Sequence, residues 1–194
     1  MAGNKIDRKT LKYYAKMASE AYVNDPVYVF ACKNEKIRKR FIYHWFLIRL
    51  NSSKKKDIFY FDEEQRGLLI LREAHYDYTM WQFLQCINWP FLVLYWPLTI
   101  KCLMAYSHLD NKDIFDDKTY IVSPVFVSPE HQGKGVATRL LKMGIEDMLS
   151  RGFKVGLETQ NPENVGFYER LGFRVAKEEY YKLEKIHNYY MIIE

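Results

Sequence analysis

Residues 125–138, VFVSPEHQGKGVAT, predict a strand that passes through a tight turn into a helix. The first three residues are β-branched or aromatic types that suit a buried strand, and Pro129 ends it because proline cannot donate to a strand ladder. Apolar residues then recur at helical spacing, at Val136, Leu140, Leu141, Ile145 and Met148. We therefore expect a strand, a glycine-containing loop and a helix to follow one another here.

The loop between this strand and this helix predicts an anion site. Gly133 and Gly135 flank Lys134, where the backbone must adopt a positive φ or approach a ligand closely. Amide N–H groups at a helix N-terminus lack intrahelical partners and favour a negative charge, most naturally a phosphate. The loop is not a Walker A loop, because Gly135 follows the lysine, and it is not a dinucleotide fingerprint, because Thr138 replaces the third glycine.

Two motifs carry a resemblance to a known family. The segment from Gln132 to Ala137 has the pattern Q-x-x-G-x-A and resembles the pyrophosphate loop of the GNAT superfamily of N-acetyltransferases, which binds the diphosphate of acetyl-coenzyme A. Residues 161–173, NPENVGFYERLGF, are similar to that superfamily's N-x-x-N/A-x-x-F/L-Y-x-x-x-G-F signature. The resemblance covers about residues 119–176, close to a third of the chain.

The resemblance implies a fold and a co-substrate. The fold is an α/β (α+β) acyl-coenzyme A N-acyltransferase fold, in which helices flank a mixed, mostly antiparallel central sheet. The co-substrate is acetyl-coenzyme A, and no metal is implied. The family also has a bulge in the strand at 119–127, where Pro124 removes one ladder N–H, and the pantetheine arm inserts in the V-shaped gap that results.

The resemblance also implies a set of cofactor-binding residues. Backbone groups that pair with the pantetheine amides are expected at Val125, Phe126 and Val127. The pyrophosphate is expected at Gln132, Gly133, Lys134, Gly135, Val136, Ala137 and Thr138. The second motif contributes Asn161, Asn164, Phe167 and Tyr168. For Asn161 the sequence leaves a second role open, as the N-cap of the helix that Pro162 begins.

Two residues are candidates for the acid–base chemistry of acetyl transfer. Tyr168 is the candidate general acid for the departing thiolate; the alternative is a core tyrosine whose hydroxyl finds a backbone partner. Glu158 ends a predicted strand and is the candidate general base, although an alternating strand could instead point it at a surface lysine. His75, His108 and His131 are further candidates for the base.

The remaining elements are predicted from periodicity and turn residues. Helices are expected at 7–22, 35–50 and 163–171, and strands at 57–61, 67–71, 153–159, 173–175 and 189–193. The basic residues at 36–40 predict a solvated helix face, and residues 51–56 predict an exposed turn.

The segment from Met80 to Tyr106 is rich in aromatic residues and leucine. Pro90 and Pro97 interrupt it, which argues against a transmembrane helix of about twenty apolar residues. We expect a kinked helical insertion, around residues 78–108, that packs on the core or lines the acceptor site or a dimer interface.

Composition bounds the class of protein. The 194 residues suit one domain, 1–194, and the hydrophobic content of 48% argues against disorder. A net charge of +5, spread over short runs, suits an anionic ligand and does not indicate nucleic acid. The three scattered cysteines and the absence of an N-terminal apolar segment predict a cytoplasmic protein.

The sequence therefore predicts an N-acetyltransferase that moves an acetyl group from acetyl-coenzyme A to a primary amine of a small molecule. Two alternatives stay open. One is the same chemistry on a protein or peptide, and the other is a non-catalytic acyl-coenzyme A sensor. A homodimer is possible.

Overall fold

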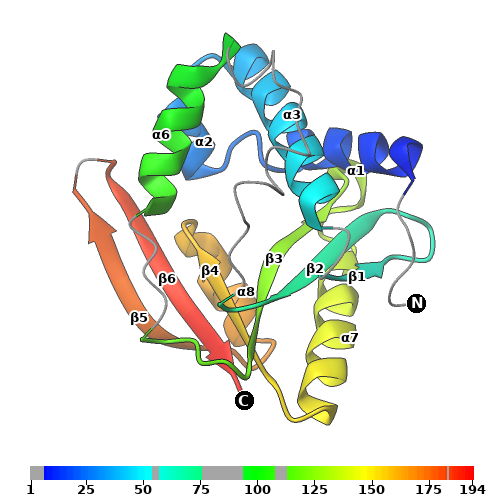
Figure 1. The fold of residues 1–194 in the computed structure, drawn as a ribbon. Helices are drawn as coiled ribbons and strands as arrows, with labels where there is room; N and C mark the ends of the chain where they lie inside the picture. The colour runs from blue at the N-terminus through cyan, green and yellow to red at the C-terminus, as the bar shows by residue number, and fades with distance from the viewer. Residues whose placement is uncertain (1–6, 54–56, 76–93, 108–112, 183) are drawn as a thin grey trace.

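The computed structural model describes residues 7–53, 57–75, 94–107, 113–182 and 184–194. The α-helices are α1 (Arg8–Ala21), α2 (Pro26–Ala31), α3 (Glu35–Ser53), α6 (Trp96–Ser107), α7 (Val136–Ser150) and α8 (Val165–Glu169). Short 3₁₀ turns are η1 (Pro129–His131) and η2 (Pro162–Asn164). The strands are β1 (Ile58–Phe61), β2 (Gly67–Glu73), β3 (Thr119–Val127), β4 (Lys154–Thr159), β5 (Arg174–Tyr181) and β6 (Ile186–Ile193) (Figure 1).

The strands form one sheet in the order β1-β2-β3-β4-β6-β5. The pair β3–β4 is parallel, and each of the other neighbouring pairs is antiparallel. The predicted mixed, mostly antiparallel sheet flanked by helices is therefore confirmed.

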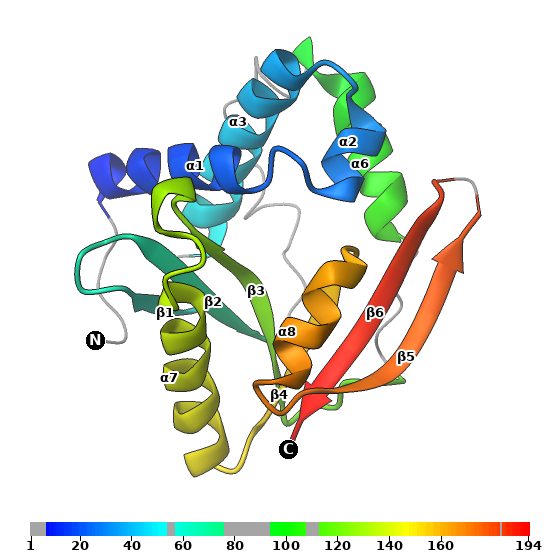
Figure 2. The same ribbon diagram turned by 180° about the vertical axis from the view of Figure 1, so that it is seen from behind.

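Helices cover both faces of β2, which explains its continuous apolar sequence. Leu68 and Ile70 belong to a buried cluster with residues of α1, α2 and α3. Leu69 and Leu71 point to the other face, where they pack in a second cluster with residues of α7. Figure 2 shows α7 and α8 on one side of the strands, so the period of two along β2 divides the core into two layers.

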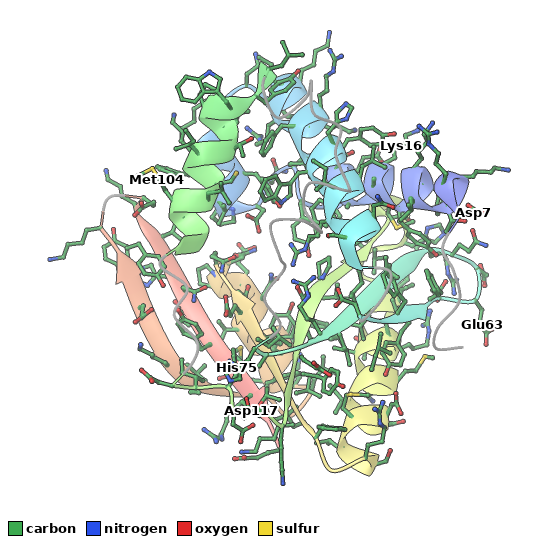
Figure 3. All side chains as sticks on the ribbon, viewed as in Figure 1. Asp7, Lys16, Glu63, His75, Met104 and Asp117 are labelled. Atoms are coloured by element: carbon green, nitrogen blue, oxygen red, sulfur yellow. The ribbon has the colours of Figure 1, made fainter. Side chains whose placement is uncertain are left out.

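Local sequence signals set the start of α1 and the end of α7. Asp7 caps α1 by accepting a hydrogen bond from Thr10 N at 2.7 Å. Lys16, on the outer face of α1, is exposed (Figure 3). At the end of α7, Gly152 adopts a φ of 77° and Phe153 N donates to Met148 O at 3.0 Å, which is a glycine-based helix stop.

The second helix differs from the prediction in two ways. Residues 51–53, predicted to begin an exposed turn, instead continue α3 to Ser53. Arg38, predicted to lie on a solvated face, is buried, and its guanidinium donates to the carbonyl oxygens of Cys32 at 2.8 Å and Lys33 at 3.2 Å. The prediction for Arg38 was wrong because carbonyl groups of the preceding loop bind its guanidinium, and local charge patterning does not reveal such partners.

The C-terminal elements are placed as expected but have different lengths. The predicted strand at 173–175 extends through β5 to Tyr181, and the one at 189–193 begins earlier, at Ile186. Most of β5 is exposed at the sheet edge, so it lacks the alternating apolar pattern that would have marked it. The predicted helix 163–171 is the turn η2 followed by the shorter α8.

Much of the predicted insertion, including Pro90, lies outside the described residues. Its last part is α6, in which Cys102 and Ala105 are buried, whereas Leu103 and Met104 are exposed (Figure 3). Pro97 was predicted to interrupt a helix. It is instead the second residue of α6, a position that tolerates proline, so the helix continues through it. In the part of the chain that the structure describes, no helix is both long enough and apolar enough to span a membrane.

Candidate active site

The site begins where β3 and β4 separate. The two strands pair at Thr119↔Lys154, Tyr120↔Val155 and Ile121↔Gly156, and no later pair joins the described residues of these strands. On the other edge of β3, the register with β2 shifts between Leu69 and Leu71. The Ser123–Pro124 peptide, which is cis, lies at this shift. The predicted irregularity is confirmed, and it leaves the second half of β3 facing a gap.

A cavity of about 720 Å³ occupies this gap and continues to the N-terminus of α7. Nearly all the predicted site residues line it, namely Val125, Phe126, Val127, Gln132, Gly133, Gly135, Val136, Ala137, Thr138, Glu158, Asn161, Asn164, Phe167 and Tyr168. Lys134 is the exception: its side chain is exposed and is not part of the wall. The structure thus brings together residues that the sequence places in three separate segments.

The loop before α7 presents its backbone to this cavity. Gly133 and Gly135 have φ values of 73° and 76°, in the left-handed region that favours glycine. The first helical hydrogen bond of α7 joins Arg139 N to Gly135 O at 3.0 Å, so the amides of residues 136–138 have no acceptor within the helix. These amides and the positive end of the helix dipole fit a diphosphate.

The strand edge in the gap is only partly available for a ligand. Tyr22 Oη donates to Val125 O at 2.8 Å, and Gln132 Nε2 donates to Val127 O at 3.3 Å. A carbonyl oxygen has two lone pairs, so each can still accept a second bond. Gln132 therefore ties the loop to the strand in addition to lining the cavity.

The two asparagines of the second motif hold the loop after β4. Asn161 Oδ1 accepts from Glu163 N at 3.1 Å, which is the cap predicted as one alternative. Asn164 Nδ2 contacts Thr159 Oγ1 at 3.5 Å. Because both residues also line the cavity, the cap and the predicted cofactor contact are compatible.

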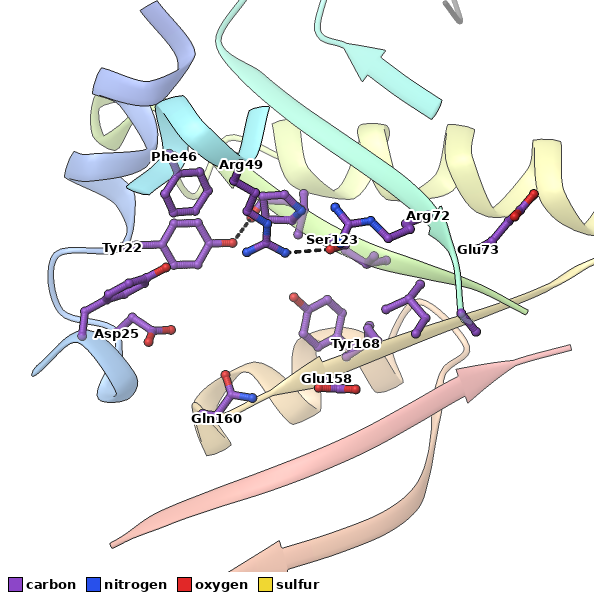
Figure 4. Close-up of a pocket in the computed structure, with 17 residues that line it drawn as sticks. Tyr22, Asp25, Phe46, Arg49, Arg72, Glu73, Ser123, Glu158, Gln160 and Tyr168 are labelled. Carbon is purple, nitrogen blue, oxygen red and sulfur yellow. Dashed lines mark hydrogen bonds between the residues drawn. The ribbon is translucent and has the colours of Figure 1, made fainter. Parts of the chain in front are cut away.

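A smaller cavity of about 280 Å³ adjoins the larger one (Figure 4). Its walls come from β2, β3, β4, α3, α8, the start of α2 and the residue that follows α1. The residues that line both cavities are Tyr22, Asp25, Val125, Glu158, Gln160 and Tyr168. Both predicted catalytic residues therefore lie where the two cavities meet.

The ring of Tyr168 packs against neighbouring aromatic residues, and Tyr168 lines the junction of the two cavities. The ring contacts those of Phe167 and Phe173, with centroids 5.2 and 5.9 Å away. Burial raises the pKa of Tyr168 to about 12, so the phenol is protonated at neutral pH. Among the described residues, none forms a hydrogen bond with its hydroxyl. The alternative role, a core tyrosine whose hydroxyl bonds to the backbone, is therefore not seen among these residues.

The candidate bases differ in position. Glu158 is half-buried and lines both cavities next to Tyr168 (Figure 4). His131 lines the larger cavity, and its Nδ1 is 2.8 Å from Ser128 Oγ. His75 lies in neither wall and is near Asp117, with Nε2 and Oδ1 3.7 Å apart. His108 lies outside the described residues.

Sequence reasoning missed several residues of the junction and its surroundings. These are Tyr22, Asp25, Arg49 and Gln160, together with Arg170 in the wall of the larger cavity. Asp25 had a local signal, because an aspartate followed by proline is a pattern of helix starts. It caps α2 by accepting from Val27 N at 3.0 Å.

Desolvation distinguishes Asp25 from an ordinary cap. Part of its surface is accessible inside the cavity, but the surrounding protein excludes bulk water and raises the pKa of Asp25 from 3.8 to about 6. A raised carboxyl pKa favours the folded state below the unfolded pKa, and this contribution is lost as the pH rises through the folded pKa. Ionised Asp25 therefore destabilises the unliganded protein above about pH 6.

Asp25→Asn is expected to stabilise the unliganded protein at pH 8 by up to about 3 kcal/mol, because asparagine retains the cap without the charge. The gain should shrink as the pH falls, to about 0.5 kcal/mol near pH 4, where Asp25 is protonated in the folded state and partly ionised in the unfolded one. Urea unfolding at the two pH values measures it. Asp7→Asn is the matched control, because Asp7 also caps a helix but the hydrogen bond from Thr10 N lowers its pKa. An equal gain for Asp25→Asn at both pH values would contradict the desolvation argument.

Comparisons with known proteins agree with this geometry. A sequence profile described as the acetyltransferase (GNAT) family matches residues 58–173. The L-methionine sulfoximine/L-methionine sulfone acetyltransferase of Salmonella typhimurium is 34% identical over 76 residues, which are 37% of this chain and 44% of that protein. The chain therefore spans less than half the length of this curated relative.

Solved structures show the same fold at low sequence identity. The PaiA N-acetyltransferase of Thermoplasma acidophilum, in complex with coenzyme A, has a TM-score of 0.55 at 14% identity, covering 100% of this chain and 98% of that one. The ribosomal-protein-S18-alanine N-acetyltransferase of Escherichia coli has a TM-score of 0.54 at 12% identity, covering 100% and 93%. Since the family profile matches more than half of the sequence, the chain belongs to the GNAT acetyltransferase family.

Proposed function

We propose that this protein transfers an acetyl group from acetyl-coenzyme A to a primary amine of a small molecule. The observation that carries the proposal is the junction of the two cavities at Tyr168 and Glu158. The larger cavity is assigned to the cofactor and the smaller one to the acceptor. An acyl group held at the junction is then accessible from both sides.

In this proposal the cofactor is bound mainly by backbone groups. The amides at residues 136–138 hold the diphosphate, and Val125, Phe126 and Val127 hold the pantetheine arm along the unpaired edge of β3. Asn161, Asn164, Phe167 and Thr138 close the wall around it. The side chain of Lys134 contributes a positive charge to the outside of the loop rather than a contact.

The cofactor supplies the thioester, and the chain supplies acid–base groups around it. Glu158 accepts a proton from the acceptor amine, directly or through a water molecule. Tyr168 donates to the departing sulfur. A pKa of about 12 lies well above that of a thiol, about 8.5 for cysteine, so proton transfer from Tyr168 to the sulfur is unfavourable by itself. As the C–N bond forms and the C–S bond breaks, the amine nitrogen loses a proton, and this proton restores the phenol through Glu158 or water.

The size of the acceptor cavity supports a small molecule. At about 280 Å³ it is just below the range of roughly 300 to 1,000 Å³ that is typical of small-molecule sites, so it suits a compact acceptor. The Salmonella relative, by its name, also acetylates small molecules. The likeness to the Escherichia coli ribosomal-protein acetyltransferase reflects the shared fold.

Coenzyme A is expected to bind stoichiometrically and to raise the melting temperature. At a concentration of about 100 times Kd the gain is roughly 2.7 kcal/mol, because the ligand binds only the folded state. Calorimetry gives the stoichiometry, and thiol release from acetyl-coenzyme A across a panel of amines gives the acceptor. Absence of binding would contradict the cofactor assignment. Binding without thiol release, for any amine or peptide, would favour the sensor alternative.

A further inference from the structure

We propose that the acceptor is a zwitterion, a compact amino acid whose carboxylate binds Arg49 and whose amino group faces Glu158. This inference rests on the proposed function, because it concerns the acceptor of that reaction. It narrows the substrate class to amines that carry a free carboxylate a few bonds from the nitrogen.

Arg49 places a guanidinium in the wall of the smaller cavity, next to the gap in the sheet. It comes from α3, and its Nη2 donates to Ser123 Oγ at 2.6 Å (Figure 4). Ser123 is buried on β3, two residues before Val125. On the other side, the Arg49 Cζ lies 5.8 Å from the centroid of the Phe46 ring. A polar anchor and an aromatic ring thus fix the orientation of the guanidinium, whose fork geometry suits a carboxylate.

Arg72, the other arginine of this cavity, is engaged differently. Its Nη2 lies 2.9 Å from Asp57 Oδ2, and its Nε lies 3.3 Å from each oxygen of the same carboxylate. A carboxylate already occupies this fork. Arg49 lies in the wall next to the gap in the sheet and is oriented by Ser123, so Arg49 is the arginine that we assign to the ligand.

The opposite side of the cavity carries acidic groups. Asp25 and Glu158 line it from the loop before α2 and from β4, and Figure 4 shows both across the open space from Arg49. Both also belong to the junction with the larger cavity, which Arg49 does not line. Glu73 also lines only the smaller cavity, and Figure 4 shows it beyond Arg72 as seen from Arg49. We therefore assign Arg49 as the cation on the side away from the cofactor, with Asp25 and Glu158 as the acidic groups beside the cofactor. A zwitterion fits this polarity with its amine toward the acyl group.

The same polarity disfavours the end of a peptide chain as acceptor. The carboxyl of an N-terminal residue is amidated, so it offers Arg49 a neutral carbonyl in place of a carboxylate. A charge-assisted hydrogen bond is stronger than a neutral one, so the difference is selective.

The first experiment uses the unmodified protein with acetyl-coenzyme A. Standard α-amino acids and β-alanine are each compared with their primary amides, alongside ethylamine and short peptides. For the best acceptor we expect kcat/KM to exceed that of its amide by about 10- to 100-fold, the range expected for one charge-assisted contact. The amide has the less basic amine, so more of it is unprotonated at pH 8, and the preference cannot arise from the amine itself.

The second experiment tests the residue. Arg49→Met should bring the ratio of acid to amide close to one, and Arg49→Lys should give an intermediate ratio because it retains charge but not the fork. Arg151→Met is the matched control. Arg151 follows the far end of the fifteen-residue α7 and is exposed, so its removal should leave the ratio unchanged. The shift in melting temperature with coenzyme A verifies that each variant is folded.

The two proposals fail in different ways. Turnover of amides or simple amines at least as fast as of amino acids would overturn this inference and leave the proposed function intact. Equally fast turnover of peptides would overturn this inference and the small-molecule acceptor, and would leave only acetyl transfer. An acid-to-amide ratio that Arg49→Met does not change would also overturn it. A protein that neither binds coenzyme A nor releases thiol would contradict both. A readout independent of turnover is the added thermal shift from the amino acid with coenzyme A present, which should be lost in Arg49→Met.

Discussion

Tyr168→Phe is expected to lower the turnover rate by roughly 10- to 10,000-fold, the effect of losing positioned proton transfer. Phenylalanine retains the ring and its contacts with Phe167 and Phe173 but cannot donate to the departing sulfur. Because no described residue bonds to the hydroxyl, its removal leaves no protein partner unsatisfied. The fold and the affinity for coenzyme A should therefore survive. Steady-state kinetics with the acceptor from the amine panel measures the rate.

The outcome separates three roles for this tyrosine. A lower kcat with unchanged coenzyme A affinity supports proton donation. Unchanged turnover with unchanged binding would return Tyr168 to a packing role. Loss of both would place the hydroxyl in the cofactor site and leave the acid unassigned. Tyr60→Phe is a useful comparison, because Tyr60 is also a buried tyrosine but is bonded to Asp147 and lines neither cavity.

Gly135→Val is expected to weaken coenzyme A binding by about 100-fold, the loss of one or two charge-assisted hydrogen bonds from backbone amides. Valine is strained at the positive φ of 76°, and its Cβ would lie 3.6 Å from Arg139 Nη1, in the loop that lines the larger cavity. At a ligand concentration of 100 times the original Kd, the stabilisation should fall from about 2.7 to about 0.4 kcal/mol. The shift in melting temperature with and without coenzyme A measures it.

Gly152→Val is a control that shows the effect of backbone strain alone, without blocking the access of coenzyme A to the loop amides. Gly152 has a φ of 77°, nearly the same as Gly135, but it lies at the other end of α7, and no atom lies near its would-be Cβ. Both variants should lose about 1 to 2 kcal/mol of intrinsic stability from the left-handed conformation. The shift caused by coenzyme A should persist in Gly152→Val. If it persisted equally in Gly135→Val, the diphosphate would have to bind elsewhere.

The loop and the parting of the strands were predictable because their signals are local. Glycines at positive φ, a proline that interrupts a ladder and a helix start are properties of a few consecutive residues. The motif at 161–173 adds Asn161 as a cap, which the structure contains. The same local reasoning failed for α2, because six largely apolar residues after Asp25 are too few to show a helical period.

The acceptor side could not be predicted from sequence. Arg49 and Ser123 are 74 positions apart and meet because α3 crosses the sheet next to the shift in β3. Nothing near Arg49 in the sequence distinguishes it from the basic residues earlier in α3. Arg38 shows the same limit, since its role depends on carbonyl groups of the preceding loop. Side chains that converge by tertiary packing leave no pattern in a single sequence.

The separation of β3 from β4 means that main-chain atoms and side chains can serve different parts of the proposed site. A ligand bound along the open edge of β3 would contact main-chain atoms, which every residue type supplies. The side chains of Phe126 and Val127 are buried in the core, so core packing constrains which residue types fit there. In the assignment proposed above, acceptor choice depends on other segments, α3 and the loop before α2. Substitutions in those segments could change the acceptor and leave the main-chain atoms of the β3 edge unaltered.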